Sequence, residues 1–142
     1  MSDRVTIGAP ATPASIELVQ TALATLWEQQ PGVTARDRMR FETALVEVVG
    51  NVVEHAYALD QGTTPGSRQL ELEISVDDST IIALLSDDGR PADIDLGAVT
   101  MPDPEAESGR GLALAIAALD DLRYVHADGR NQWTLICVRV RP

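Results

Sequence analysis

The chain has 142 residues, of which 44% are apolar and 23% are charged. This length predicts a single domain over residues 1–142, and the even spread of apolar residues argues against wholesale disorder. With 22 acidic and 11 basic residues the formal net charge is −11, which argues against direct binding to the phosphates of a nucleic acid.

All 11 basic residues are arginine, and lysine is absent. A P-loop and the usual protein-kinase fold each place a lysine on the nucleotide phosphates, so neither is expected here. No apolar run approaches the roughly 20 residues that cross a bilayer, and residues 1–10 lack the pattern of a signal peptide. We therefore expect a cytoplasmic protein with no membrane partner.

The first half of the chain predicts a short strand followed by two helices. Residues 5–7 are β-prone, and apolar residues then recur at helical spacing over about 13–30. Thr34, followed three residues later by Asp37, has the form of a capping box. It predicts the start of a second helix that runs to about Leu59.

The second half predicts four strands and one helix. Apolar residues alternate over 70–76, and 80–85 is a more continuously apolar strand, so the two segments predict a hairpin. After a long loop comes a helix over 112–122 that is apolar on nearly every side, so we expect it to be well buried. Strands follow at 123–127 and 133–140. These elements predict a two-layer α/β sandwich, in which a mixed, mostly antiparallel sheet is covered on one face by about three helices.

The second predicted helix carries a polar row on an otherwise apolar surface. Residues 47–57 read EVVGNVVEHAY, and at about 100° per residue Glu47 and Asn51 share one arc with two other polar side chains. A carboxylate and a carboxamide one turn apart form a pair of directed oxygen ligands. Gly50, beside them, is either a tolerated defect or a point where another chain or a ligand comes close.

Two glycine-containing segments are candidates for ligand binding. Asp87-Asp88-Gly89 follows a strand directly, and it is either a plain turn or a site where a carboxylate accepts the exocyclic amine of a purine. Gly109-Arg110-Gly111 precedes a helix, and it has the form of an anion site at a helix N-terminus.

Together, E-x3-N-x3-HAY at 47–57, DDGRP at 87–91 and GRGL at 109–112 resemble the Bergerat-type ATP site of the histidine-kinase-like ATPase superfamily. Within that superfamily the short chain, the HAY ending and a brief lid at about 90–108 look like the anti-sigma-factor serine/threonine kinases of bacterial partner-switching systems. The resemblance implies the Bergerat ATP-binding fold, with ATP and Mg²⁺ as cofactors.

The resemblance also implies a role for each matching residue. Glu47 would be the catalytic base that orients or deprotonates the attacking hydroxyl, and Asn51 would be the Mg²⁺ ligand. Asp87 would bind the adenine amino group, with Gly89 beside the ring. The residues implied to hold the phosphates at the end of the lid are Gly109, Arg110, Gly111 and Leu112.

The sequence departs from the superfamily pattern at two places. Pro91 stands where the wider superfamily often has glycine, which stiffens the entrance to the lid. The Gly-Thr pair common near the last strands is not obvious, although Gly129 and Thr134 flank the place. On this basis Thr134 is included among the expected nucleotide contacts.

The resemblance implies an ATP-dependent serine/threonine protein kinase that phosphorylates a small antagonist of an anti-sigma factor. When not engaged with that antagonist, such a kinase sequesters a sigma factor, commonly as a homodimer. The alternatives are a non-catalytic module whose protein binding is gated by ATP or ADP, and the detached ATP-binding half of a histidine kinase. The presence of Glu47 favours the kinase over the module.

Overall fold

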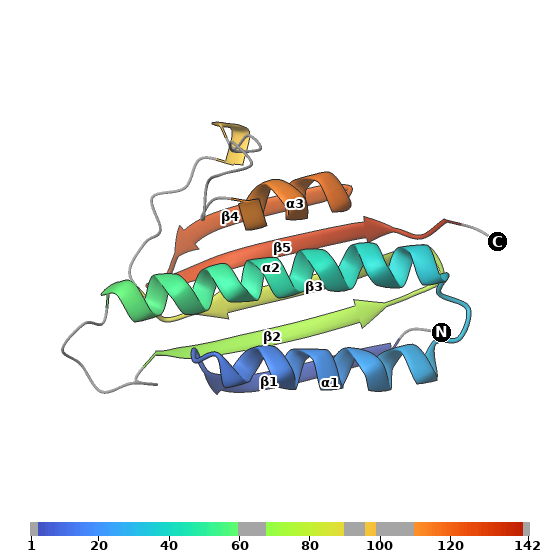
Figure 1. Cartoon of the computed structure of the whole chain (residues 1–142), viewed down its shortest axis with the longest axis horizontal. Helices are drawn as coiled ribbons and strands as arrows, with labels where there is room; N and C mark the ends of the chain where they lie inside the picture. Colours follow the sequence, from blue (N-terminus) through green and yellow to red (C-terminus); the bar gives the residue numbers. More distant parts are fainter. Residues whose placement is uncertain (1–2, 60–67, 90–95, 99–109, 141–142) are drawn as a thin grey trace.

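The computed structural model (Figure 1) describes residues 3–59, 68–89, 96–98 and 110–140, without the side chains of 56–59, 98 and 110. Its elements in chain order are β1 Asp3–Pro10, α1 Ala14–Gln29, α2 Ala35–Leu59, β2 Gln69–Val76, β3 Thr80–Asp87, the 3-10 helix η1 Leu96–Ala98, α3 Arg110–Ala118, β4 Asp121–Ala127 and β5 Arg130–Val138.

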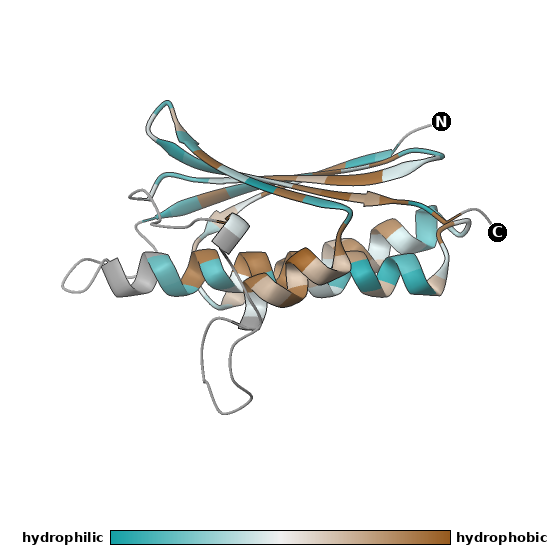
Figure 2. Ribbon diagram, turned by 90° about the horizontal axis from the view of Figure 1, so that it is seen from above, coloured by the Kyte–Doolittle hydropathy of each residue, from teal (hydrophilic) through white to brown (hydrophobic). Residues whose placement is uncertain are grey.

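One sheet with strand order β1-β2-β3-β5-β4 forms the first layer, and the helices cover only one of its faces (Figure 2). The predicted two-layer α/β sandwich is therefore confirmed. All four neighbouring pairs among the described strands are antiparallel, so the sheet lacks the parallel part of the predicted mixture. The reason is that β4 runs in the same direction as β3, but β5 lies between them.

Alternation along the strands decides which side chains face the helices. On β3 the buried series Ile81, Ala83 and Leu85 continues to Asp87, so an aspartate takes the next inward position. The inward residues of β2 are those the alternation predicts, namely Leu70, Leu72, Ile74 and Val76. The open face of the sheet carries the intervening residues.

The 25-residue helix α2 is fixed at its start and along one side. The backbone N–H of Asp37 donates to Oγ1 of Thr34 over 3.1 Å, which confirms the predicted cap. The apolar side of the helix, with Phe41 and Leu45 fully buried, belongs to the single core. Its polar side is therefore held at a constant orientation to the sheet.

Helix α3 differs from its prediction in length and burial. It ends at Ala118, and Leu114 and Ile116 are exposed, so the expectation that this helix is buried on nearly every side is wrong. The reason is that, among the described helices and strands, only α2 and β4 pack against α3. No helix in the described ranges has the length and apolar character needed to cross a membrane.

The turn between β2 and β3 depends on a carboxylate. Oδ1 of Asp77 accepts hydrogen bonds from the backbone N–H groups of Ser79 and Thr80, both over 2.8 Å. These bonds hold the pKa of Asp77 below its usual value of 3.8, and the bond from Ser79 has the larger effect. Because the folded-state pKa is the lower one, the resulting stabilisation is present above pH 3.8 and is lost as the pH falls through the folded-state pKa.

We predict that Asp77→Asn removes this pH-dependent stabilisation. The free energy of unfolding of the wild type should exceed that of the variant near neutral pH, and the difference should shrink as the pH falls below about 4. Urea unfolding at a series of pH values measures it, with Asp78→Asn as the neighbouring control. A wild-type advantage that does not change with pH would contradict the assignment.

Candidate functional site

The regions that carry the three motifs lie toward the same end of the molecule. The C-terminal half of α2, the end of β3 and the first turn of α3 are all directed to the left of Figure 1. β5 begins at this end too, because it pairs antiparallel with β3. The site is therefore assembled from two helices and two strands.

Asp87 faces the helices from the last position of β3 and is only 4% exposed. Its Oδ1 accepts two hydrogen bonds, from the backbone N–H of Gly89 over 2.8 Å and from Nδ2 of Asn131 over 2.9 Å. No described residue donates to Oδ2 of Asp87. One oxygen thus fixes the carboxylate, and the other has no donor among the described residues.

Asn131 and Tyr124 are functional candidates that the sequence analysis missed. Asn131 is 1% exposed and lies directly opposite Asp87 in the register of β3 and β5. The hydroxyl of Tyr124 donates to Oδ1 of Asn131, which directs Nδ2 of Asn131 toward Asp87. The available signal was the alternation of β5, because counting back by two from the apolar Trp133 gives Asn131 an inward position.

The two adjacent aspartates have different tasks. A Cβ added to Gly89 would lie 2.7 Å from Oδ1 of Asp87, so a side chain at this position would displace the carboxylate. Asp88 is turned to β2, where its Oδ1 accepts the backbone N–H of Gln69 over 2.9 Å. Its own N–H donates to the carbonyl of Gln69 over 3.3 Å. Asp88 therefore fastens the strand end from which Asp87 faces the site.

Glu47 lies against the first turn of α3. A Cβ added to Gly111 would be 2.6 Å from Oε2 of Glu47, so the carboxylate occupies the volume that a side chain there would take. The first N–H groups of a helix have no partner within the helix and carry the positive end of its dipole. The contact thus places a carboxylate beside a helix end that carries positive partial charge.

Asn51 follows Glu47 by one turn of α2. Both side chains are partly exposed, whereas Val48 and Val49 between them and Val52 after Asn51 are buried. Neither polar side chain forms a hydrogen bond with another residue in the described part of the chain. Mg²⁺ takes few protein oxygens and keeps waters and phosphate oxygens, so the amide oxygen of Asn51 fits it as a protein ligand.

Leu112 and Thr134 are the other predicted nucleotide contacts whose side chains the structure describes, and they lie in different places. The side chain of Leu112 packs on the core. Thr134 lies on the open face, where it lines a shallow hollow of about 290 Å³ with Glu71 and Glu73. The structure does not bring Thr134 together with Asp87, because its neighbours Trp133 and Leu135 take the inward positions of β5. Outside the described residues are Gly109, the side chain of Arg110 and the predicted lid at 90–108 except for 96–98.

Solved structures of similar shape come from two bacteria. The RsbU and RsbW domains of Rv1364c from Mycobacterium tuberculosis match with a TM-score of 0.65 and 24% identity, over 99% of this chain and 33% of that chain. The SiaB–SiaC complex from Pseudomonas aeruginosa matches with a TM-score of 0.63 and 16% identity, over 94% and 89% of the two chains. At these identities the likeness shows the fold alone, and the chain spans about a third of the Mycobacterium tuberculosis chain.

The sequence itself gives the family. No curated protein matches the chain. Residues 9–137, however, match the family model described as the histidine kinase-like ATPase domain. This match covers nearly the whole sequence, including α2, the end of β3 and the start of α3. The chain therefore belongs to the family of histidine kinase-like ATPase domains.

Proposed function

We propose that the chain is an ATP- and Mg²⁺-dependent serine/threonine protein kinase of the partner-switching type. It would phosphorylate a small antagonist protein and bind a sigma factor when it is not engaged with that antagonist. The observation that carries the proposal is the Glu47 carboxylate beside the first turn of α3, one helical turn from Asn51. Likeness in fold to an RsbW domain and to SiaB, which was solved with SiaC, supports it.

The site residues would divide the work between base recognition and phosphoryl transfer. Oδ2 of Asp87 would accept the adenine amine, and it would reject guanine, which has a carbonyl at the corresponding position. The first turn of α3 would hold the phosphates, and Asn51 would hold Mg²⁺. When bound, Mg²⁺–ATP supplies the phosphoryl group, and its transfer depends mainly on positioning and charge neutralisation.

Glu47 would act on the incoming hydroxyl rather than on the nucleotide. A carboxylate on a helix held by the core can orient a serine or threonine hydroxyl and accept its proton as the new oxygen–phosphorus bond forms and the bond from the γ-phosphorus to ADP breaks. Its partial exposure leaves it accessible to a second protein. The proposal therefore gives Glu47 a role that a module merely gated by nucleotide would not require.

The charge of the chain bears on its proposed partners. The formal net charge of −11 favours a partner with a basic or neutral surface over another acidic protein. A basic segment of a sigma factor fits this requirement. A homodimer of the kinase is also part of the proposal.

The proposed function is tested by incubating the purified protein with labelled ATP, Mg²⁺ and the antagonist-like proteins of its own genome. We expect phosphoserine or phosphothreonine on one of them. Nucleotide-dependent binding of such a protein without any transfer would instead support the non-catalytic module. Label on an acid-labile histidine would support the histidine-kinase alternative.

We predict that Asp87→Asn weakens ATP binding about tenfold to a hundredfold, because a hydrogen bond to a charged acceptor is worth about 1.5–3 kcal/mol. Titration calorimetry with ATP and Mg²⁺ measures the dissociation constant. Asp88→Asn is the matched control, because asparagine keeps a side-chain oxygen that can accept the N–H of Gln69 and should leave the affinity near that of the wild type. Equal affinities for Asp87→Asn and the wild type would remove the assigned role.

We predict that Glu47→Ala retains ATP binding and lowers the transfer rate about a hundredfold or more, as expected for loss of a general base. Single-turnover transfer to the antagonist and a parallel binding titration separate the two effects. Glu54→Ala changes an exposed carboxylate on the same helix and should preserve the rate. The catalytic claim fails if the wild type and Glu47→Ala transfer phosphate equally fast.

We predict that Gly111→Ala lowers the transfer rate about tenfold, because its Cβ displaces the Glu47 carboxylate while the backbone N–H groups are retained. Gly50→Ala is the matched control, because no described atom lies within 4 Å of its added Cβ. It should leave the rate unchanged and raise the free energy of unfolding by about 0.5–1 kcal/mol. The transfer rates of both variants are measured in the same assay. Equal rates for Gly111→Ala and Gly50→Ala would contradict the argument.

A further inference from the structure

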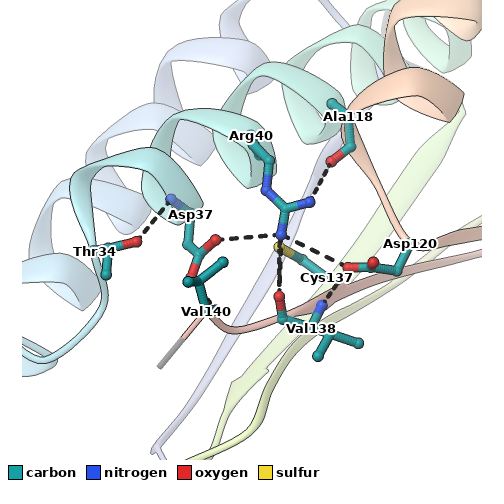
Figure 3. Close-up of polar contacts among 8 residues, drawn as sticks. All are labelled: Thr34, Asp37, Arg40, Ala118, Asp120, Cys137, Val138 and Val140. Carbon is teal, nitrogen blue, oxygen red and sulfur yellow. Dashed lines mark hydrogen bonds and ion pairs between the residues drawn. The ribbon is translucent and has the colours of Figure 1, made fainter. Parts of the chain in front are cut away.

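Helix α3 is held against α2 at two points, one a close packing contact and the other a hydrogen bond. At the start of α3, the Gly111 backbone lies against the carboxylate of Glu47. At its end, Nη1 of Arg40 donates to the carbonyl of Ala118 over 3.3 Å (Figure 3). On each helix the two points are seven residues apart, close to two helical turns. The two helices are therefore held antiparallel in one register.

The second terminal nitrogen of the Arg40 guanidinium, Nη2, connects this junction to the sheet. Nη2 donates to the carbonyl of Val138 and to Sγ of Cys137, both over 3.0 Å, and lies 3.2 Å from Oδ1 of the fully buried Asp37. Asp120, just after α3, lies 3.7 Å from the same nitrogen. Figure 3 shows the guanidinium at the centre of these contacts from α2, α3 and β5.

The carboxylates around Arg40 continue the same network. Oδ2 of Asp120 accepts the backbone N–H of Val138 over 2.6 Å, and Oδ2 of Asp37 accepts that of Val140 over 2.8 Å. A flat guanidinium with donors on both ends can hold several acceptors in one plane, which a single ammonium group cannot do. Arg40 is thus fixed to the C-terminal end of β5 while it holds the end of α3.

We propose that Arg40 is a positioning residue for the site, because it sets the register that brings Gly111 against Glu47. The nine-residue helix α3 transmits a displacement of Ala118 to Gly111. Asp87 and Asn131 lie on β3 and β5 and keep their mutual hydrogen bond when α3 slides. The effect of Arg40 should therefore reach Glu47 and spare the recognition of adenine. The kinetic part of this inference rests on the proposed function, whereas the register itself does not.

Arg38 provides a matched control on the same helix. Its Nε donates to the carbonyl of Val33 over 3.0 Å, and its Nη2 to those of Trp27 and Gln30, both over 3.3 Å. Arg38 therefore holds α1 and the connection to α2, and in the described part of the chain none of its hydrogen bonds reaches α3. Loss of either arginine removes bonds to backbone carbonyls, but only loss of Arg40 should alter the register.

The register is tested by the amide resonance of Gly111 in the nucleotide-free protein at constant pH. Glu47→Gln replaces the carboxylate that lies against Gly111 by an amide and should shift this resonance. We expect this shift to be at least about twofold smaller in an Arg40→Gln background and unchanged in an Arg38→Gln background. An equal shift in the folded Arg40→Gln background would overturn the inference. If that variant does not fold, Arg40→Lys is measured instead. Lysine keeps the positive charge but lacks the two terminal nitrogens of the guanidinium, so it should give the same reduction.

The consequence for the reaction is a split between rate and affinity. Arg40→Gln should lower kcat for transfer about tenfold while the dissociation constant for ATP stays within about twofold, because misplacement of about 1 Å impairs a reacting group. Arg38→Gln should change neither value at a temperature where all variants are folded. Equal kcat for the two variants would overturn the positioning role. Absence of transfer by the wild type, with the expected resonance response, would reject the proposed function and support the register.

Discussion

The site depends on the close packing of α3 against α2. The core buries one side of α2, so Glu47 and Asn51 remain at the edge of that helix. Gly111 has no side chain, and the space this leaves is filled by the Glu47 carboxylate. A helix held by the core on one side and by a second helix on another cannot rotate freely. The direction of its two polar side chains is therefore a property of the fold, present before any ligand binds.

The sheet contributes the other half of the site through one buried polar pair. Asp87 and Asn131 take inward positions that continue the apolar series of β3 and β5, and they lie opposite each other. Buried polar groups are tolerated when they are hydrogen-bonded, and Gly89 and Tyr124 supply the additional partners. In the proposed function, base recognition is assigned to the strands and phosphoryl transfer to the helices. The two tasks can then be altered separately by substitution.

The sequence predicted the layers and the main motifs because their signals are local. Helical and strand periodicity gave the sandwich, and three short motifs identified Glu47, Asp87 and Gly111. Contacts between distant segments have no such signal, and the bonds from Arg40 to Ala118 and Val138 could not be read from spacing. Thr134 is a different case, since alternation with its apolar neighbours already placed it on the opposite face from Asp87.

The most direct test of the account is a calorimetric comparison of ATP and GTP binding to the wild-type protein, with Mg²⁺ and with a chelator. The orientation of the free oxygen of Asp87 predicts ATP binding that is strengthened by Mg²⁺ and at least about tenfold tighter than GTP binding, since one lost hydrogen bond to a buried charged group costs this much or more. Equal affinities for the two nucleotides, or no uptake of either by folded protein, would contradict it.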